Sequence, residues 1–147
     1  GLPLQAPGWF TQGWPGTPLD GELWAGRGAF EQVAGTLRQQ PARETRWRQL
    51  RFMAFDLPAE QGGFDTRHAA LLRLLQRPGA QVTAVAVQRL ADPAALQALL
   101  QQTVAGGGEG LMLHRADASY RAQRSDAADD IDFQHGDRRN TVLRRGV

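Results

Sequence analysis

The sequence has 147 residues, 41% of them apolar and 22% charged, which is typical of one globular domain with a core of its own. It contains no cysteine, which excludes a disulfide framework, a zinc–thiolate site and a thiol nucleophile. All 17 basic side chains are arginines, so no amine side chain can act as a nucleophile, and a net charge of +2 leaves nucleic-acid affinity to local arginine placement.

The first half of the sequence alternates extended and helical patterns. Residues 1–17 are rich in Pro, Gly and Trp and predict a loop, after which residues 18–24 predict a strand. Apolar residues at helical spacing predict a helix within residues 28–40, and Pro41 ends it. A loop then leads into a strand at roughly residues 50–57.

The clearest helical pattern covers residues 64–77. Asp65 or Thr66 is the predicted cap, and His68 is predicted to lie on the polar side of the helix. The alternating segment that follows, residues 81–90, predicts a strand partly buried on both faces.

The last predicted helix has strong boundary signals. Asp92 is its predicted N-cap, a proline follows at the first helical position, and Gly106 lies just past its end. Residues 109–115 predict a final strand. Residues 116–147 are polar and predict no packed element beyond about Tyr120, so we expect a solvated tail there.

Carboxylates interrupt two of the apolar segments. Asp20 and Glu22 share a face of their strand because strand residues two apart point the same way, and Glu109 opens the last strand. Two or three such groups could hold Mg²⁺ together with water and substrate phosphates. They could also form the acid/base pair of a glycoside hydrolase, or simply face solvent on a half-exposed sheet.

The segment "FMAFD" offers aromatic side chains that could line a pocket. Phe52 and Phe55 flank Met53, and an aromatic ring that stacks on a nucleobase contributes about 1–3 kcal/mol. The same pattern also fits an ordinary core strand.

A basic segment, "PARETRWRQLR", surrounds Trp47 with arginines. Such interleaving suits nucleic-acid contact, and a solvated loop with Trp47 turned inward is the alternative. Its arginines are Arg43, Arg46, Arg48 and Arg51.

Three segments, "LDGELWAGRGAFEQV", "LRFMAFDLP" and "GGGEGLMLHRADASY", resemble ATP-dependent DNA ligases in their order and spacing. The resemblance is greatest to the small bacterial ligases that contain little beyond an adenylation domain and an OB-fold, and it covers roughly residues 2–126. It implies an α+β nucleotidyltransferase fold, like that of DNA ligases and mRNA capping enzymes, with antiparallel sheets flanked by helices and ATP between them. We therefore expect a partial adenylation domain at residues 1–126 and an unmatched polar tail at residues 127–147.

The resemblance also assigns roles to single residues. It implies that Glu22 contacts the ribose and helps to organise Mg²⁺, that Phe55 stacks on adenine, and that Glu109 binds the metal. ATP binding would then involve Glu22, Phe55 and Glu109. The resemblance also implies that Arg124 contacts phosphate or DNA, and the basic segment around Trp47 predicts the same contact for Arg46 and Arg48.

The sequence departs from the ligase pattern in three respects. The nucleophilic lysine of the family's K-x-D-G motif would precede residue 1, a second lysine pair after Asp126 is replaced by acids, and the OB-fold is missing. The expectation is a truncated, inactive fragment with no catalytic residue of its own, from an enzyme that seals nicks in DNA repair, replication and recombination. Alternatives are a non-catalytic nucleotide or nucleic-acid binding remnant and a two-carboxylate glycoside hydrolase.

The expected partners are ATP and nicked double-stranded DNA. No run of 18 apolar residues exists, so we expect no membrane-spanning helix. The family is monomeric, but a truncated sheet would leave open edges, so self-association is expected. The resemblance is compatible with a periplasmic or a cytoplasmic location in a bacterium.

Overall fold

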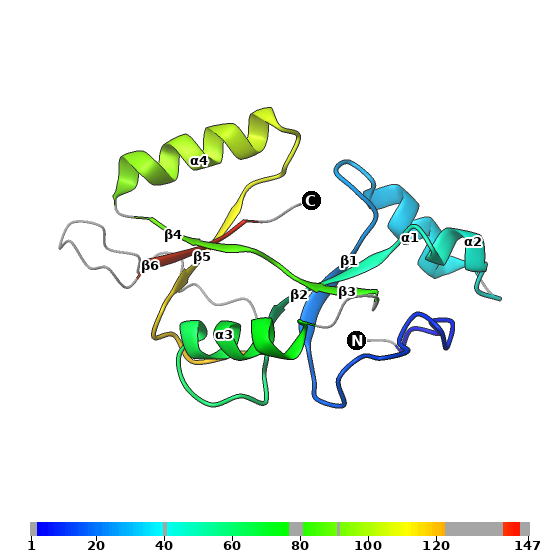
Figure 1. Ribbon diagram of the computed structural model, residues 1–147. Helices are drawn as coiled ribbons and strands as arrows, with labels where there is room; N and C mark the ends of the chain where they lie inside the picture. The colour runs from blue at the N-terminus through cyan, green and yellow to red at the C-terminus, as the bar shows by residue number, and fades with distance from the viewer. Residues whose placement is uncertain (1–2, 40, 77–80, 91, 123–139, 145–147) are drawn as a thin grey trace.

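The computed structural model (Figure 1) describes residues 3–39, 41–76, 81–90, 92–122 and 140–144. In chain order its elements are β1 (Asp20–Trp24), α1 (Phe30–Arg38), α2 (Glu44–Trp47), β2 (Arg51–Asp56), α3 (Phe64–Leu74), β3 (Val82–Ala84), β4 (Val87–Arg89), α4 (Pro93–Ala105), β5 (Leu111–Arg115) and β6 (Asn140–Arg144). In this part of the chain no helix is long and apolar enough to cross a bilayer.

The strands form two three-stranded sheets, with the orders β1-β2-β3 and β4-β6-β5. The second sheet is antiparallel, as expected. The first is mixed and not antiparallel throughout, because β2 pairs with β1 antiparallel but with β3 parallel. The parallel pair arises because α3 lies between β2 and β3 and carries the chain back to the same end of the sheet.

The single strand predicted for residues 81–90 is divided between the two sheets. Its first part, β3, pairs with β2, and its second part, β4, pairs with β6. Val85 lies at the division, where its backbone N–H donates to the carbonyl of Ala54. Alternation of side chains carries no information about which strand lies alongside, so the sequence pattern could not predict this division.

The predicted tail contains a strand. Asn140–Arg144 forms β6, which lies between β4 and β5 and pairs with both, so the expectation of no packed element after about Tyr120 is wrong for this segment. The rest of the predicted unmatched tail, residues 127–139 and 145–147, lies outside the described residues.

Helix α3 begins earlier than the capping signals predict. Gly63 is its N-cap and provides no side-chain hydrogen bond, so neither Asp65 nor Thr66 caps the helix. The N–H of Asp65 donates instead to the carbonyl of Ala116, and its carboxylate pairs with Arg89 of β4. The start of α3 is therefore held by tertiary contacts.

The predicted boundaries of α4 are confirmed. The Asp92 carboxylate accepts a hydrogen bond from the N–H of Ala95 at 2.8 Å, Pro93 is the first helical residue, and Gly106 is the C-cap. These are local interactions between neighbours in sequence, which explains why the sequence predicts them well.

Each sheet is covered on one face by a helix, as Figure 1 shows for α3 and α4. The core beneath α3 comprises Ala54, Leu57, Leu71 and Val82. The core beneath α4 is built on Leu90 and Leu99, with Leu111 and Leu113 of β5 against them. A further core packs the N-terminal segment against α1 and α2, around Phe10, Trp47 and Leu50.

The faces of the two sheets that α3 and α4 leave free are joined by what we term the inter-sheet cluster. It is centred on the buried Phe64 and Val85. Half-buried side chains from β2, β4 and β5 complete it: Met53, Phe55, Val87 and Met112. This cluster brings the segments that carry the candidate site residues into one region.

Candidate functional site

Glu22 lies in the middle of β1, on the face that carries the inter-sheet cluster. Its position is opposite Met53 in the antiparallel pair, and residues opposite each other in a sheet project from the same face. The side chain is half-buried and makes interactions with its surroundings. Glu22 and Phe55 therefore lie on neighbouring strands and on one side of the first sheet.

Phe55 lies at an irregularity in the β1–β2 pairing. Asp20 is opposite Asp56 and Gly21 is opposite Ala54, so Phe55 between them has no residue opposite. This is a β-bulge, a feature that redirects a side chain and is frequent beside functional sites. Phe55 belongs to the inter-sheet cluster and remains half-buried.

Glu109 lies in the segment that leads into the second sheet, two residues before β5. A tight turn leads to it from α4, with the N–H of Gly108 donating to the carbonyl of Thr103 at 2.9 Å. A Cβ on Gly108 would lie only 2.8 Å from a methyl carbon of Thr103, so this turn requires glycine. The Glu109 side chain is exposed.

The predicted trio of Asp20, Glu22 and Glu109 does not form a metal site. Among the described residues, no group of three or more His, Asp or Glu side chains could hold an ion. Mg²⁺ that is bound together with a nucleotide usually takes only one or two carboxylates, with water and phosphate oxygens as its other ligands.

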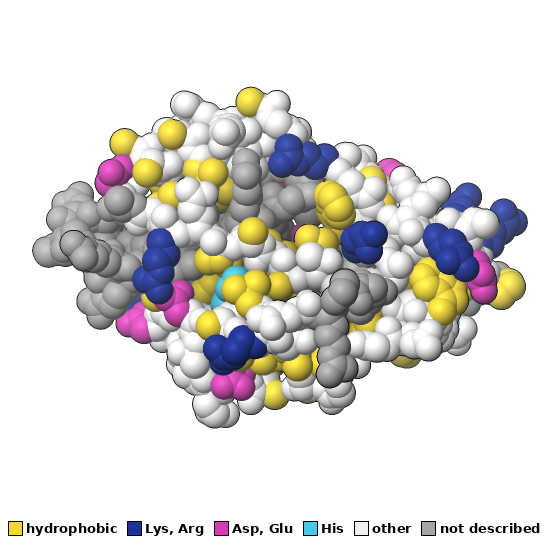
Figure 2. Space-filling model, viewed as in Figure 1, with side chains coloured by type: hydrophobic (Ala, Val, Ile, Leu, Met, Phe, Trp, Pro, Cys, Tyr) yellow, Lys and Arg dark blue, Asp and Glu magenta, His cyan; other side chains and the backbone are white. Residues whose placement is uncertain are grey.

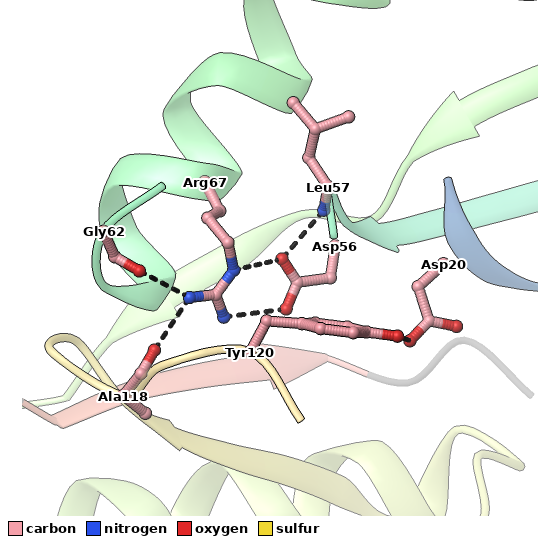
Figure 3. Close-up of polar contacts among 7 residues, drawn as sticks. All are labelled: Asp20, Asp56, Leu57, Gly62, Arg67, Ala118 and Tyr120. Carbon is pink, nitrogen blue, oxygen red and sulfur yellow. Dashed lines mark hydrogen bonds and ion pairs between the residues drawn. The ribbon is translucent and has the colours of Figure 1, made fainter. Parts of the chain in front are cut away.

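Asp20 is engaged by a tyrosine. The hydroxyl of Tyr120, which follows β5, donates to Oδ2 of Asp20 at 3.0 Å (Figure 3). Burial raises the pKa of Tyr120, and the hydrogen bond and negative charge of Asp20 raise this pKa further. At the other end of β1, Arg27 donates from Nη1 to the carbonyl of Gly106 at the end of α4.

A buried ion pair stands next to these residues (Figure 3). Arg67 of α3 contacts the Asp56 carboxylate through two parallel hydrogen bonds, Nε to Oδ1 at 2.7 Å and Nη2 to Oδ2 at 2.9 Å. Its Nη1 donates to the carbonyls of Gly62 and Ala118, each at 2.8 Å, and Asp56 accepts from the N–H of Leu57 at 2.8 Å. The network ties β2, α3 and the segment after β5 together.

Two histidines flank Phe64 of the inter-sheet cluster. The ring of His114 lies parallel to that of Phe64, with centroids 4.3 Å apart, and His68 stacks at 5.7 Å. His68 is buried with Nε2 2.9 Å from the carbonyl of Val85, so its predicted place on a polar helix face is wrong. Burial lowers the pKa of His114. The negative charge of Asp56 raises this pKa, and the positive charge of Arg67 lowers it.

The basic segment exposes its arginines but not its aromatic residue. Trp47 is 2% exposed and packs against Phe10, so the reading with Trp47 turned inward is the one observed. Arg46 is exposed, and Arg48 lies over the ring of Trp9 at 5.0 Å. Basic side chains on the face shown in Figure 2 are spread out and do not form one patch. Arg124 lies outside the described residues.

Two surface hollows lie apart from Glu22, Phe55 and Glu109. One, of about 430 Å³, is bordered by Leu57, Ala70 and Arg73 among others, and a second, of about 480 Å³, lies beside Gly62 and Tyr120. Neither is lined by Glu22, Phe55 or Glu109.

Sequence reasoning predicts Glu22, Phe55 and Glu109 as site residues but does not predict the residues that connect their strands. Arg27, Arg67 and Tyr120 all make contacts across long stretches of sequence, of 79, 11 and 100 residues. No spacing rule relates such partners. The only available signals are the two glycines around Arg27 and the presence of Tyr120 within a segment of the ligase-like pattern.

Comparison with known proteins points to one class. No protein-family model matches the sequence. A DNA ligase of Haemophilus influenzae is 28% identical over 126 residues, which is 85% of this chain and 46% of that protein. A solved chain from a structure-function analysis of Lig E DNA ligases, concerned with DNA binding by a minimal scaffold, is 33% identical with a TM-score of 0.74 and matches 97% of this chain.

The chain is thus a DNA ligase-like domain in both sequence and fold. It spans about half the length of the relatives it matches, 46% of one and 52% of the other.

Proposed function

We propose that this chain is the nucleotide-binding part of an ATP-dependent DNA ligase, with an adenylation-domain fold of the nucleotidyltransferase type. The observation that carries the proposal is the likeness to a Lig E DNA ligase over 97% of the chain, with a TM-score of 0.74. The common face of Glu22 and Phe55, and the inter-sheet cluster that joins their sheet to β5, support the same conclusion.

In this proposal ATP binds between the sheets, with Phe55 against adenine and Glu22 near the ribose. Glu22 and Glu109 would contribute carboxylate oxygens to Mg²⁺, whose chemistry is to polarise the phosphates. The 147 residues include no lysine, so they cannot form a lysyl-adenylate themselves. We therefore expect this polypeptide to bind Mg-ATP reversibly without taking up AMP covalently.

Calorimetric titration with Mg-ATP tests the proposal. Phe55→Leu should weaken binding by about 1–3 kcal/mol, the usual contribution of a base–aromatic stack. Glu22→Gln and Glu109→Gln should weaken binding in Mg²⁺ more than in its absence. Glu31→Gln is the matched control, since Glu31 is an exposed carboxylate of α1 that forms a surface ion pair with Arg38. Undiminished affinity in all three site variants would contradict the proposal.

Labelling provides the second arm. Incubation with ATP labelled at the α-phosphate and Mg²⁺ should leave the 147-residue chain unlabelled. An acid-labile, base-stable label on the chain would contradict the expected lack of self-adenylation.

Nucleic-acid binding without nucleotide chemistry is the second candidate, and the exposure of Arg43 and Arg46 favours it. Binding to a nicked duplex should weaken linearly with salt on logarithmic axes, and Arg46→Ala should reduce that slope by about 1 if Arg46 contacts a phosphate. No binding at low salt would exclude this candidate.

A further inference from the structure

The strands β1 and β5 are connected at both ends, although they belong to different sheets. Arg27, which follows β1, contacts Gly106, which precedes β5. Asp20, which begins β1, contacts Tyr120, which follows β5. The two strands therefore run in opposite directions along the boundary between the sheets, and a polar contact closes each end.

The candidate acids lie between these two contacts. Glu22 is in the middle of β1, and Glu109 is three residues beyond Gly106. The Arg27–Gly106 contact therefore links the segment after β1 to the turn that carries Glu109.

The side chain of Arg27 follows the turn between α4 and β5 closely. A Cβ on Gly106 would lie 2.5 Å from Nη1 of Arg27, and one on Gly107 would lie 3.8 Å from Cδ. The acceptor is a carbonyl at the C-terminus of a helix, where the helix dipole favours a positive charge. Arg27 itself stands between two glycines, Gly26 and Gly28, at φ of 119° and 70°.

The two connections differ in how firmly they are held. At the Tyr120 end, the buried Arg67 also holds the carbonyl of Ala118, so this end is part of the ion-pair network. At the other end, Arg27 is exposed and reaches across to a turn of successive glycines. Among the contacts described above, the one at that end is made by a single exposed side chain.

We propose that Arg27 is a positioning residue, which sets the separation of Glu22 and Glu109 by fixing the α4–β5 turn to the end of β1. The inference rests on the proposed function, because it assigns a role to Arg27 in the same nucleotide site.

The effect of Arg27 on the spacing of the two sheets can be measured without nucleotide, as the distance between a spin label in α2 and one in α4. The chain has no cysteine, so spin labels attach only at the introduced Thr45→Cys in α2 and Gln101→Cys in α4, both exposed positions. Arg27→Ala should lengthen and broaden the measured distance distribution. Arg38→Ala, an exposed arginine in α1, should leave it unchanged, and Arg27→Lys, which retains a cationic donor, should restore it in large part. An unchanged distribution in Arg27→Ala would overturn the proposal.

Mg-ATP affinity separates the inference from the proposed function. Arg27→Ala should weaken binding about tenfold, equivalent to one lost charge-assisted hydrogen bond, while Arg38→Ala binds normally. Equal affinity of Arg27→Ala and the unmodified chain would overturn the positioning role. If the unmodified chain binds no Mg-ATP, the proposed function fails, and the distance measurement alone decides whether Arg27 sets the spacing.

Discussion

Arg67 is a charged side chain that is only 2% exposed, on a helix whose Ala70 and Leu71 pack in the core of the first sheet. The local sequence does not predict its hydrogen bonds, because the partners come from β2, from the residues just before α3 and from the segment after β5. The energetic role of such a pair appears when one member is removed, since the other is then left as a buried charge without a counterion.

We predict that Arg67→Met lowers the free energy of unfolding by about 3–5 kcal/mol, because Asp56 becomes an unpaired buried carboxylate. Replacing both partners, with Asp56→Leu added to Arg67→Met, should recover a large part of this loss. Urea denaturation followed by circular dichroism measures both values. A double variant as unstable as the single one would show that the network matters for its carbonyl contacts and not for its charge balance.

We predict that His114 makes stability depend on pH. The unfolded chain protonates this histidine at a pKa near 6.5, whereas burial lowers the pKa in the folded state. Below about pH 6.5 the unfolded state therefore binds more protons than the folded state. The contribution of His114 to the free energy of unfolding is complete above that pH and is lost as the pH falls towards the folded-state pKa. His114→Phe keeps the ring stack and should flatten the decrease between about pH 7 and pH 5. Identical pH profiles of stability for His114→Phe and the unmodified chain would contradict this role.

At the residue level, the sequence was informative wherever a side chain's role follows from its neighbours. Glu22 lies within a strand, as the alternating pattern predicts, and Trp47 is turned inward, which is one of the two interpretations of the basic segment. His68 was misplaced because a carbonyl of Val85, 17 residues away, satisfies its ring nitrogen in the interior. Polarity predicts exposure only when no such partner is available.

Among the elements, β1 and β2 pair closely because position 21 of β1 is a glycine. A Cβ at Gly21 would lie 2.5 Å from the carbonyl oxygen of Met53 and 2.6 Å from the ring of Phe52. We predict that Gly21→Ala costs about 1–3 kcal/mol of stability, because strand and ring must move apart. Thermal denaturation would measure the loss.

Gly35 in α1 is the matched control for this prediction. A Cβ there would meet only the end of Arg46, at 3.8 Å. Gly35→Ala should therefore stabilise the chain by about 0.5–1 kcal/mol, since alanine loses less entropy than glycine in a helix. Destabilisation of equal size at both positions would refute the steric explanation.

The elements themselves were predicted to very different degrees. The boundaries of α4 follow from Asp92 and Pro93, whose effects are complete within one helical turn. The division between β3 and β4, and the insertion of β6 between β4 and β5, depend on pairing between distant segments. Because the side-chain period is the same in every strand, such pairing cannot be predicted from alternation alone.

For the whole molecule, the sheet order leaves β1 and β3 as the outer strands of one sheet and β4 and β5 as those of the other, among the strands that the structure describes. Outer strands can pair with another copy of the chain, so we predict concentration-dependent self-association. Sedimentation velocity at several concentrations would detect it. A single monomeric species throughout the concentration range would contradict the prediction.

The tryptophans are distributed unevenly, because they lie in the N-terminal part of the fold. All four tryptophans precede β2, and Trp9, Trp14 and Trp47 belong to the core around Phe10, whereas the second sheet and α4 contain none. Indole fluorescence thus reports on one half of the fold, while the far-ultraviolet signal reports on both. If the halves melt together the two curves superimpose, and if the second half melts first the emission stays native while ellipticity is already being lost.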